Sequence, residues 1–308
     1  MKYLIIGAGG TGGAIAGYLK KAGVDAEIIA RGRALEEIRK NGLTVKTKKY
    51  GDFNVNIDAY SMEEYAGKPD VIIVCVKYYS LLEVKEFLKR TAADETLVIP
   101  VLNVFTTGKE LSQGLSSTVF DGCIYIYSMI ERPGVILQPT EIFRVFFGAR
   151  QGQSISGSIE KKALLAEKDL KEANIDARFT NEIEKEALTK FSFVSPMGAA
   201  AVYLDARGRD FKKEGQAREL FISLINEVTL LGKAMGIKLR DDLVEKNLRI
   251  MDSMTDDSTT SMQRDILSGG KSEIDGLVHV MARLSRQYGV ELKNYEKISK
   301  WADEKGIK

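Results

Sequence analysis

A glycine-rich segment near the N-terminus has the residue types and spacing that bind a pyrophosphate. It lies between an apolar run and a helical pattern and has the form GxGxxG, as Gly7-Ala8-Gly9-Gly10-Thr11-Gly12. In this context the first glycine permits a tight turn, the second lets the backbone approach the phosphates, and the third lets helix and strand pack closely. The helix N-terminus adds free N–H groups and the positive end of a dipole. We expect a dinucleotide site; the alternative is a tight strand–helix turn without a ligand.

Two arginines follow the second expected strand, where a cofactor ribose would lie. NAD sites usually place Asp or Glu about 20 residues beyond the glycines, to bind the ribose 2′-hydroxyl. This chain has Arg31 and Arg33 there, and the carboxylate of Glu27 comes too early in the strand. A guanidinium binds a phosphate as a planar fork, so the pattern favours NADP(H). The alternative is that both arginines are solvated loop residues.

Two polar residues come directly after apolar runs. Lys77 follows Val71–Val76, and Asn103 follows Leu97–Val101. The carboxyl ends of parallel strands face the ligand crevice of an open sheet, so both side chains are candidates for contact with a cofactor. The alternatives are an exposed lysine and a turn asparagine.

Lys190 is the main candidate for a proton donor. Reduction of a ketone by a nicotinamide builds negative charge on oxygen, which a cationic acid can stabilise and then protonate. His279 is the only histidine and lies in an apolar-striped pattern, which leaves lysine as the main choice. Lys190 precedes the apolar stretch Phe191–Val194. Taken alone, it is more often a surface lysine whose alkyl stem lies on apolar groups.

A polar segment further along the chain is harder to interpret from its residues alone. Thr260–Asp265 and Glu273 carry groups that suit a site. They also suit helix starts, with Thr260 and Ser261 as caps and Glu273 as a first-turn acid.

The elements that would position these residues fall into two classes. The first part of the chain alternates continuously apolar runs with helical patterns, which predicts an α/β doubly wound sheet of the Rossmann type. Later runs that include Val119–Ile126 are punctuated by prolines and predict hairpins or edge strands. From about Thr180 onward, apolar residues recur at helical spacing. We therefore expect a dinucleotide-binding domain over residues 1–179 and an all-α domain over residues 180–308.

The composition excludes several classes of function. The 308 residues carry 45 Lys+Arg and 43 Asp+Glu, a balance of +2 that gives no electrostatic footprint for nucleic acid. No apolar run approaches the ~18 residues that span a bilayer. Cys75 and Cys123 cannot form a disulfide framework, which fits the cytoplasm, and one histidine argues against a catalytic triad or a metal site. A helical second half can present a homodimer face, although no stripe identifies one.

Taken together in order and spacing, these motifs resemble the ketopantoate reductase (2-dehydropantoate 2-reductase) family over essentially the whole chain. The resemblance implies a Rossmann domain, a helical domain, and an active site in the cleft between them. It implies NADPH-dependent reduction of 2-dehydropantoate to (R)-pantoate, a step toward pantothenate and coenzyme A. Lys190 would be the general acid, and Glu273 would hold the lysine or the substrate hydroxyl and contact the cofactor.

The resemblance also assigns the remaining polar residues. Arg31 and Lys77 would bind the cofactor, and Asn103 would touch both the nicotinamide ribose and the substrate. The substrate carboxylate would be held by the segment Ser261, Met262, Gln263 and Arg264.

Some residues depart from the family pattern. Members commonly have Gly where this chain has Val104, and Asn where it has Val194 and Gly198. Each lost amide removes a polar substrate contact, which bears on discrimination between substrates. We expect Ser195 to replace one of them, and Pro196 to free the carbonyl of Ser192. Two alternatives stay open: a reductase of another small 2-keto acid, and an NADP(H)-binding sensor without turnover.

Overall fold

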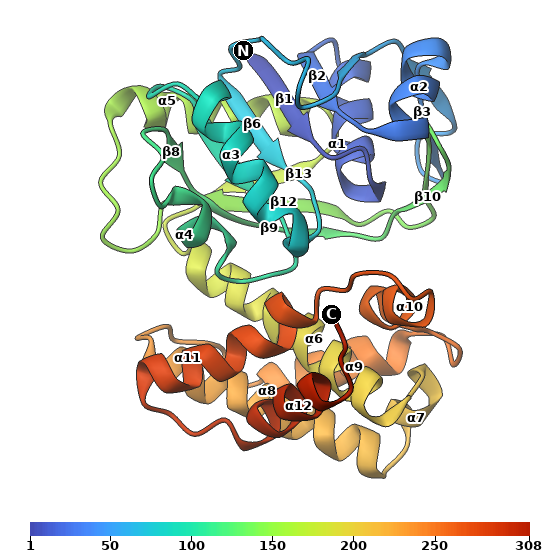
Figure 1. Cartoon of the computed structure of the whole chain (residues 1–308), viewed down its shortest axis with the longest axis vertical. Coiled ribbons are helices and arrows are strands. Elements are labelled where there is room, and N and C mark those ends of the chain that lie inside the picture. The colour runs from blue at the N-terminus through green and yellow to red at the C-terminus, as the bar shows by residue number, and fades with distance from the viewer. The chain divides into compact units, whose positions relative to one another are not determined.

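The computed structural model describes residues 1–308, which divide into two compact units. Unit 1 comprises Met1–Leu102 and Thr106–Ile183, and unit 2 comprises Asn103–Phe105 and Glu184–Lys308. Figure 1 colours the chain from its N-terminus to its C-terminus. The division is not a single cut in the chain, because three residues from the first part belong with the helical unit.

Unit 1 is built on a six-stranded sheet in which every neighbouring pair is parallel. The strand order is β5-β2-β1-β6-β7-β8, so the chain first adds strands on one side of β1 and then returns to add the others on its opposite side, as in a Rossmann sheet. The predicted fold class of this part is confirmed. The strands are β1 (Lys2–Ile6), β2 (Asp25–Ile29), β5 (Asp58–Tyr60), β6 (Val71–Val74), β7 (Leu97–Pro100) and β8 (Thr118–Val119).

Successive side chains of a strand point to opposite faces of the sheet, and in this sheet the side chains on both faces are buried. In β1, Leu4 and Ile6 join a core that includes Leu88 of α3 (Leu81–Thr91). Tyr3 and Ile5 join the core that contains the apolar residues of α1 (Gly10–Lys21). Figure 1 shows α3 in front of the sheet. The continuously apolar sequence of these strands is explained by cover on both sides.

Two smaller sheets complete unit 1. One has the order β10-β11-β3-β4, from β10 (Met129–Arg132), β11 (Val135–Gln138), β3 (Leu43–Thr47) and β4 (Phe53–Val55). The other has the order β13-β12-β9, from β13 (Asp176–Phe179), β12 (Phe143–Gly148) and β9 (Asp121–Ile126). The remaining elements are α2 (Gly32–Asn41), η1 (Tyr78–Ser80), α4 (Thr107–Ser112) and α5 (Gly157–Glu172).

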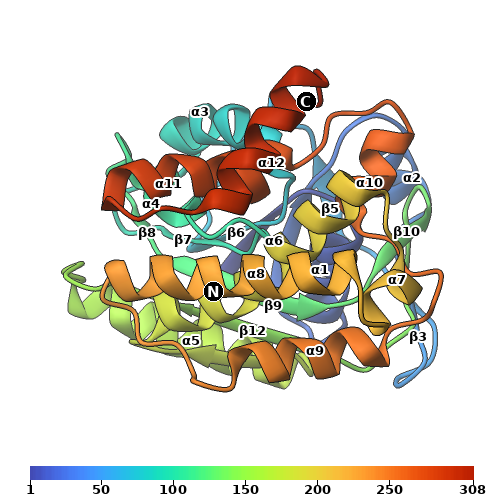
Figure 2. The same cartoon turned by 90° about the horizontal axis from the view of Figure 1, so that it is seen from below.

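Unit 2 is helical apart from its connections, and its helices run from yellow to red in Figure 2. The helices are α6 (Ile183–Leu204), α7 (Gly208–Lys212), α8 (Gln216–Ala234), α9 (Leu243–Ser253), α10 (Ser261–Leu267), α11 (Val280–Tyr288) and α12 (Lys293–Glu304). A π-helical turn, η2 (Asp275–His279), leads directly into α11. The predicted apolar stripes form its core: Leu224 and Val228 of α8 and Leu277 of η2 are at most 2% exposed. No helix of either unit is long and apolar enough to cross a membrane.

Candidate active site

The glycine turn joins β1 to α1 at the point where the order of the parallel sheet reverses. Gly7 has a φ of +107°, which favours glycine over any other residue. A Cβ on Gly12 would lie 1.9 Å from the Gly7 carbonyl oxygen, so only glycine lets the helix pack this close to the strand. A Cβ on Gly9 would instead meet nothing within 4 Å. The second glycine thus leaves open space that the protein's own packing does not use, which fits a ligand that approaches the backbone.

The end of β2 offers an arginine and no free carboxylate. Arg31 is exposed and immediately precedes α2. Glu27 is buried within β2, where its carboxylate accepts a hydrogen bond from Tyr65 Oη at 2.8 Å and pairs with Lys2 Nζ at 2.9 Å. This pairing raises the pKa of Lys2. Glu27 therefore serves the interior of unit 1, as its early place in the strand suggested.

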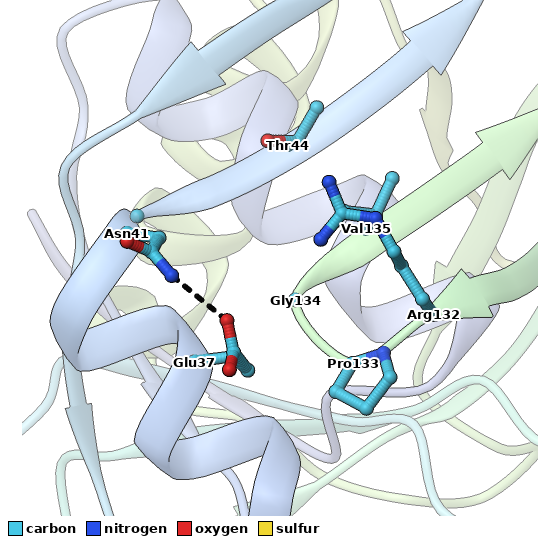
Figure 3. Close-up of a pocket in the computed structure, with 8 residues that line it drawn as sticks. Glu37, Asn41, Thr44, Arg132, Pro133, Gly134 and Val135 are labelled. Carbon is cyan, nitrogen blue, oxygen red and sulfur yellow. Dashed lines mark hydrogen bonds between the residues drawn. The ribbon is translucent and has the colours of Figure 1, made fainter.

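Lys77 is half-buried and lies three residues beyond β6, and its backbone carbonyl accepts a hydrogen bond from the Ser80 amide. One hollow in unit 1, of about 310 Å³, lies elsewhere. Figure 3 shows it between the C-terminal end of α2, with Glu37 and Asn41, and the turn at Pro133. None of the predicted cofactor-binding residues lines it, so it is not the candidate site.

In unit 2, the structure brings together two of the predicted residues. Lys190 Nζ donates a hydrogen bond to Asn103 Oδ1 at 2.7 Å, although the residues are 87 positions apart. The segment that carries Asn103 is attached through Phe105, whose ring lies 6.3 Å from that of Phe191. Lys190 is 9% exposed. This contact holds an ammonium at a defined position on helix α6.

The polar segment around α10 divides into residues that cap the helix and residues that remain accessible. Gln263 is buried, shares a capping box with Thr260, and donates from Nε2 to the carbonyls of Ala201 and Ala206. Met262 is completely buried. Both side chains are therefore packed inside the unit, and their expected contacts with a substrate stay predictions.

Of the four expected substrate-binding residues in this segment, Ser261 and Arg264 remain accessible. Ser261 opens α10 and is half-buried, whereas Arg264 is exposed and bonds to the Thr259 carbonyl and hydroxyl. Glu273 is 2% exposed and lies two residues before η2. Its backbone carbonyl accepts from the Leu277 amide at 2.9 Å.

Ser195 bonds two groups inside unit 2. The residue is completely buried, and its Oγ donates to the Leu277 carbonyl at 2.6 Å while lying 2.7 Å from Tyr295 Oη. The proton of the hydroxyl and one of its lone pairs are thus used within unit 2, and its expected contact with a substrate stays a prediction. Ser195 is five positions beyond Lys190 along the chain. Their directions around the helix differ.

Sequence reasoning also missed Asn247. The carbonyl of Ser192, which Pro196 deprives of its helical donor, accepts a hydrogen bond from the buried Asn247 side chain at 3.0 Å, and α6 continues through Pro196. The proline itself was the signal, because an orphaned buried carbonyl needs a donor.

A glycine turn after the first strand of a Rossmann sheet and a buried, hydrogen-bonded lysine on a helical unit are features of the nicotinamide-dependent oxidoreductases as a class. Residues 3–152 match the family described as "Ketopantoate reductase PanE/ApbA", and residues 182–305 match its C-terminal domain. The chain belongs to the ketopantoate reductase family.

Two curated relatives are similar over most of their length. The uncharacterized oxidoreductase YkpB of Bacillus subtilis (strain 168) is 28% identical over 90% of this chain and 89% of its own. The 2-dehydropantoate 2-reductase of Aquifex aeolicus (strain VF5) is 23% identical over 100% of this chain and 97% of its own.

Solved structures share the fold at lower identity. A PanE/ApbA family ketopantoate reductase from Ralstonia eutropha JMP134 is 20% identical, covers 98% of this chain and 97% of its own, and has a TM-score of 0.87. A D-mandelate dehydrogenase with NADH and anilino(oxo)acetate is 19% identical, covers 97% and 96%, and has a TM-score of 0.84. A dimeric ketopantoate reductase from Staphylococcus aureus is 17% identical, covers 98% and 97%, and has a TM-score of 0.80.

Proposed function

We propose that this protein reduces 2-dehydropantoate to (R)-pantoate with NADPH, as a step in pantothenate and coenzyme A biosynthesis. The observation that carries the proposal is the hydrogen bond from Lys190 Nζ to Asn103 Oδ1, in a chain of the ketopantoate reductase family. A ketone reductase needs a proton donor held in one place, and this contact provides one.

The residues of unit 1 fit a dinucleotide. The open space at Gly9 admits a pyrophosphate, and the first amides of α1 can bind its oxygens. Arg31 and Lys77 complete the set of cofactor-binding residues in the proposal. NADP(H) is favoured over NAD(H) because Arg31 stands where a carboxylate would read the ribose 2′-hydroxyl, and Glu27 is committed to Lys2 and Tyr65.

In the proposed reaction, bound NADPH supplies a hydride to the carbonyl carbon. Lys190 donates a proton from Nζ to the carbonyl oxygen and stabilises the negative charge that develops there. Asn103 orients the ammonium of Lys190. Glu273 holds Lys190 or the substrate hydroxyl in place and contacts the cofactor. Ser261 and Arg264 hold the substrate carboxylate, which a guanidinium binds with two parallel bonds.

A second candidate function is reduction of another small 2-keto acid. Val194 and Gly198 follow Lys190 by four and eight residues on one face of α6, and neither has a polar side chain. An apolar side chain beside the proton donor suits a branched alkyl substrate better than a hydroxylated one. The D-mandelate dehydrogenase with a similar fold was solved with NADH and a different 2-oxo acid, anilino(oxo)acetate.

The test is a steady-state assay of NADPH oxidation with 2-dehydropantoate, 2-ketoisovalerate and pyruvate, repeated with NADH. We expect the highest kcat/KM for 2-dehydropantoate with NADPH. A much higher value for 2-ketoisovalerate would replace the proposed reaction by the second candidate. Lys190→Ala is expected to lower kcat about 10²-fold or more, as for loss of a general acid, and an unchanged kcat would remove Lys190 from the mechanism.

The proposal extends to the protein's location and assembly. Both cysteines are free thiols, which fits a cytoplasmic enzyme of a biosynthetic pathway. The dimeric ketopantoate reductase of similar fold makes a homodimer the assembly to test, by light scattering at several concentrations.

A further inference from the structure

Helix α6 contains a proline at a point where a buried asparagine makes good the missing hydrogen bond. Pro196 has no N–H, so the carbonyl of Ser192 lacks its helical donor. Asn247 Nδ2, from α9, donates to that carbonyl at 3.0 Å and to Ser192 Oγ at 3.0 Å. Asn247 is 1% exposed. A polar group this deeply buried is committed to α6.

The residue before the proline ties the same helix to the segment that follows Glu273. Ser195 Oγ donates to the carbonyl of Leu277 in η2 and bonds Tyr295 Oη of α12. A hydroxyl has one proton and a carbonyl only accepts, so Tyr295 is the donor in the second bond. The Leu277 amide bonds the Glu273 carbonyl. Ser195 is therefore linked to Glu273 through a single backbone turn.

Tyr295 is itself held from a third helix. The amides of Asn294 and Tyr295 donate to the carboxylate of Glu227 on α8, at 2.8 and 3.1 Å. A carboxylate is favourable at this helix N-terminus. Burial raises the pKa of Tyr295, so its hydroxyl stays protonated and remains a donor.

These contacts lie on the side of α6 away from Lys190. At 3.6 residues per turn, Ser192 is about 160° around the helix from Lys190, and Ser195 is about 140° from it in the other sense of rotation. Asn103 bonds Lys190 on one side of α6. On the opposite side, Asn247, Ser195 and Tyr295 make the hydrogen bonds that hold the helix. We call these three residues the α6 anchor.

We propose that the α6 anchor is a set of positioning residues that fixes the helix bearing Lys190 against the segment bearing Glu273. This inference rests on the proposed function. A proton donor must lie within hydrogen-bond reach of the reacting oxygen, and a misplacement of about 1 Å can cost about 10²-fold in rate. Loss of one anchor bond allows a smaller shift, for which we expect about a tenfold loss of kcat.

The experiment compares Ser195→Ala and Tyr295→Phe with the control Ser285→Ala. Ser285 is also a buried serine of unit 2, and its hydroxyl donates either to the Val290 carbonyl or to the Glu296 carboxylate, neither of which belongs to α6. Both anchor variants are expected to lower kcat about tenfold, with KM for the keto acid and Kd for NADPH within twofold of the unaltered protein. Ser285→Ala is expected to lower the Tm by about as much as the two anchor variants do, and to leave kcat unchanged.

A second arm separates positioning from a general loss of structure. If Ser195 acts through Lys190, then Ser195→Ala added to Lys190→Ala changes the residual kcat less than twofold. The anchor is overturned by an unchanged kcat in both single variants, by an equal loss in Ser285→Ala, or by a tenfold loss that persists without Lys190. Tyr295→Phe decides the question if Ser195→Ala does not fold.

Failure of the anchor is distinguishable from failure of the proposed function. The unaltered protein is assayed first, and absence of keto acid reduction there overturns both. Normal turnover in the unaltered protein together with any of the three contrary results above overturns the anchor alone.

Discussion

Substitution of two glycines of the turn, Gly9 and Gly12, distinguishes an effect on ligand binding from an effect on stability. Gly9 has a φ of −75°, and a Cβ there would meet nothing within 4 Å. Gly12 would place a Cβ 1.9 Å from the Gly7 carbonyl oxygen. We therefore expect Gly9→Ala to weaken cofactor binding with little change in the free energy of unfolding, and Gly12→Ala to lower the free energy of unfolding.

The magnitudes follow from these distances. Alanine is a poorer residue than glycine at a helix N-cap, so Gly9→Ala should lower the free energy of unfolding by less than about 1 kcal/mol. Its methyl group would occupy the space proposed for the pyrophosphate. Loss of one hydrogen bond to a charged group, about 1.5–3 kcal/mol, corresponds to a rise of about 10- to 100-fold in Kd for NADPH. Gly12→Ala should lower the free energy of unfolding by at least about 1–3 kcal/mol, as overpacking does.

The assays are NADPH titration by fluorescence and urea unfolding, each carried out on both variants. Comparing the two keeps a binding effect apart from a stability effect. Unchanged NADPH affinity in Gly9→Ala would refute the placement of the pyrophosphate on this glycine. Full stability in Gly12→Ala would refute the packing argument, because the turn would then have room for a side chain.

Three further outcomes are expected. Arg31→Ala should weaken NADPH binding far more than NADH binding in parallel titrations, and equal weakening would mean that Arg31 does not read the 2′-phosphate. Asn103→Ala removes the acceptor of Lys190 Nζ and should lower kcat about 10- to 100-fold, the equivalent of about 1.5–3 kcal/mol, whereas a fall below twofold would contradict an orienting role. The Arg218 hydrogen bond lowers the pKa of Asp252, so the stability that this pair contributes is present at neutral pH and is lost as the pH falls through the lowered pKa. Asp252→Asn should therefore lower the free energy of unfolding by about 0.5 kcal/mol at pH 7 and by less at pH 3, measured by urea unfolding. An equal loss at both pH values would exclude this linkage.

The expected strands of the large sheet show where sequence reasoning succeeds. The apolar runs Val71–Val76 and Leu97–Val101 predict strands because both faces of a central parallel strand are buried, and a buried strand has a continuously apolar sequence. By contrast, β3 alternates in burial and pairs in parallel with β11, about 90 residues later in the chain. A short, half-polar strand with a distant partner has no local signal, and β3, β4 and β5 were missed.

By itself, the sequence determined the glycine turn, the arginine after the second strand, and the change from an α/β unit to a helical one. Each of these depends on neighbouring residues, so local order is enough to reveal it. Only the tertiary structure decided that Lys190 meets Asn103, that Glu27 bonds Tyr65, and that Ser195 bonds Tyr295. Those outcomes depend on which side of a helix or strand a side chain occupies and on what a distant segment brings there, and spacing along the chain specifies neither.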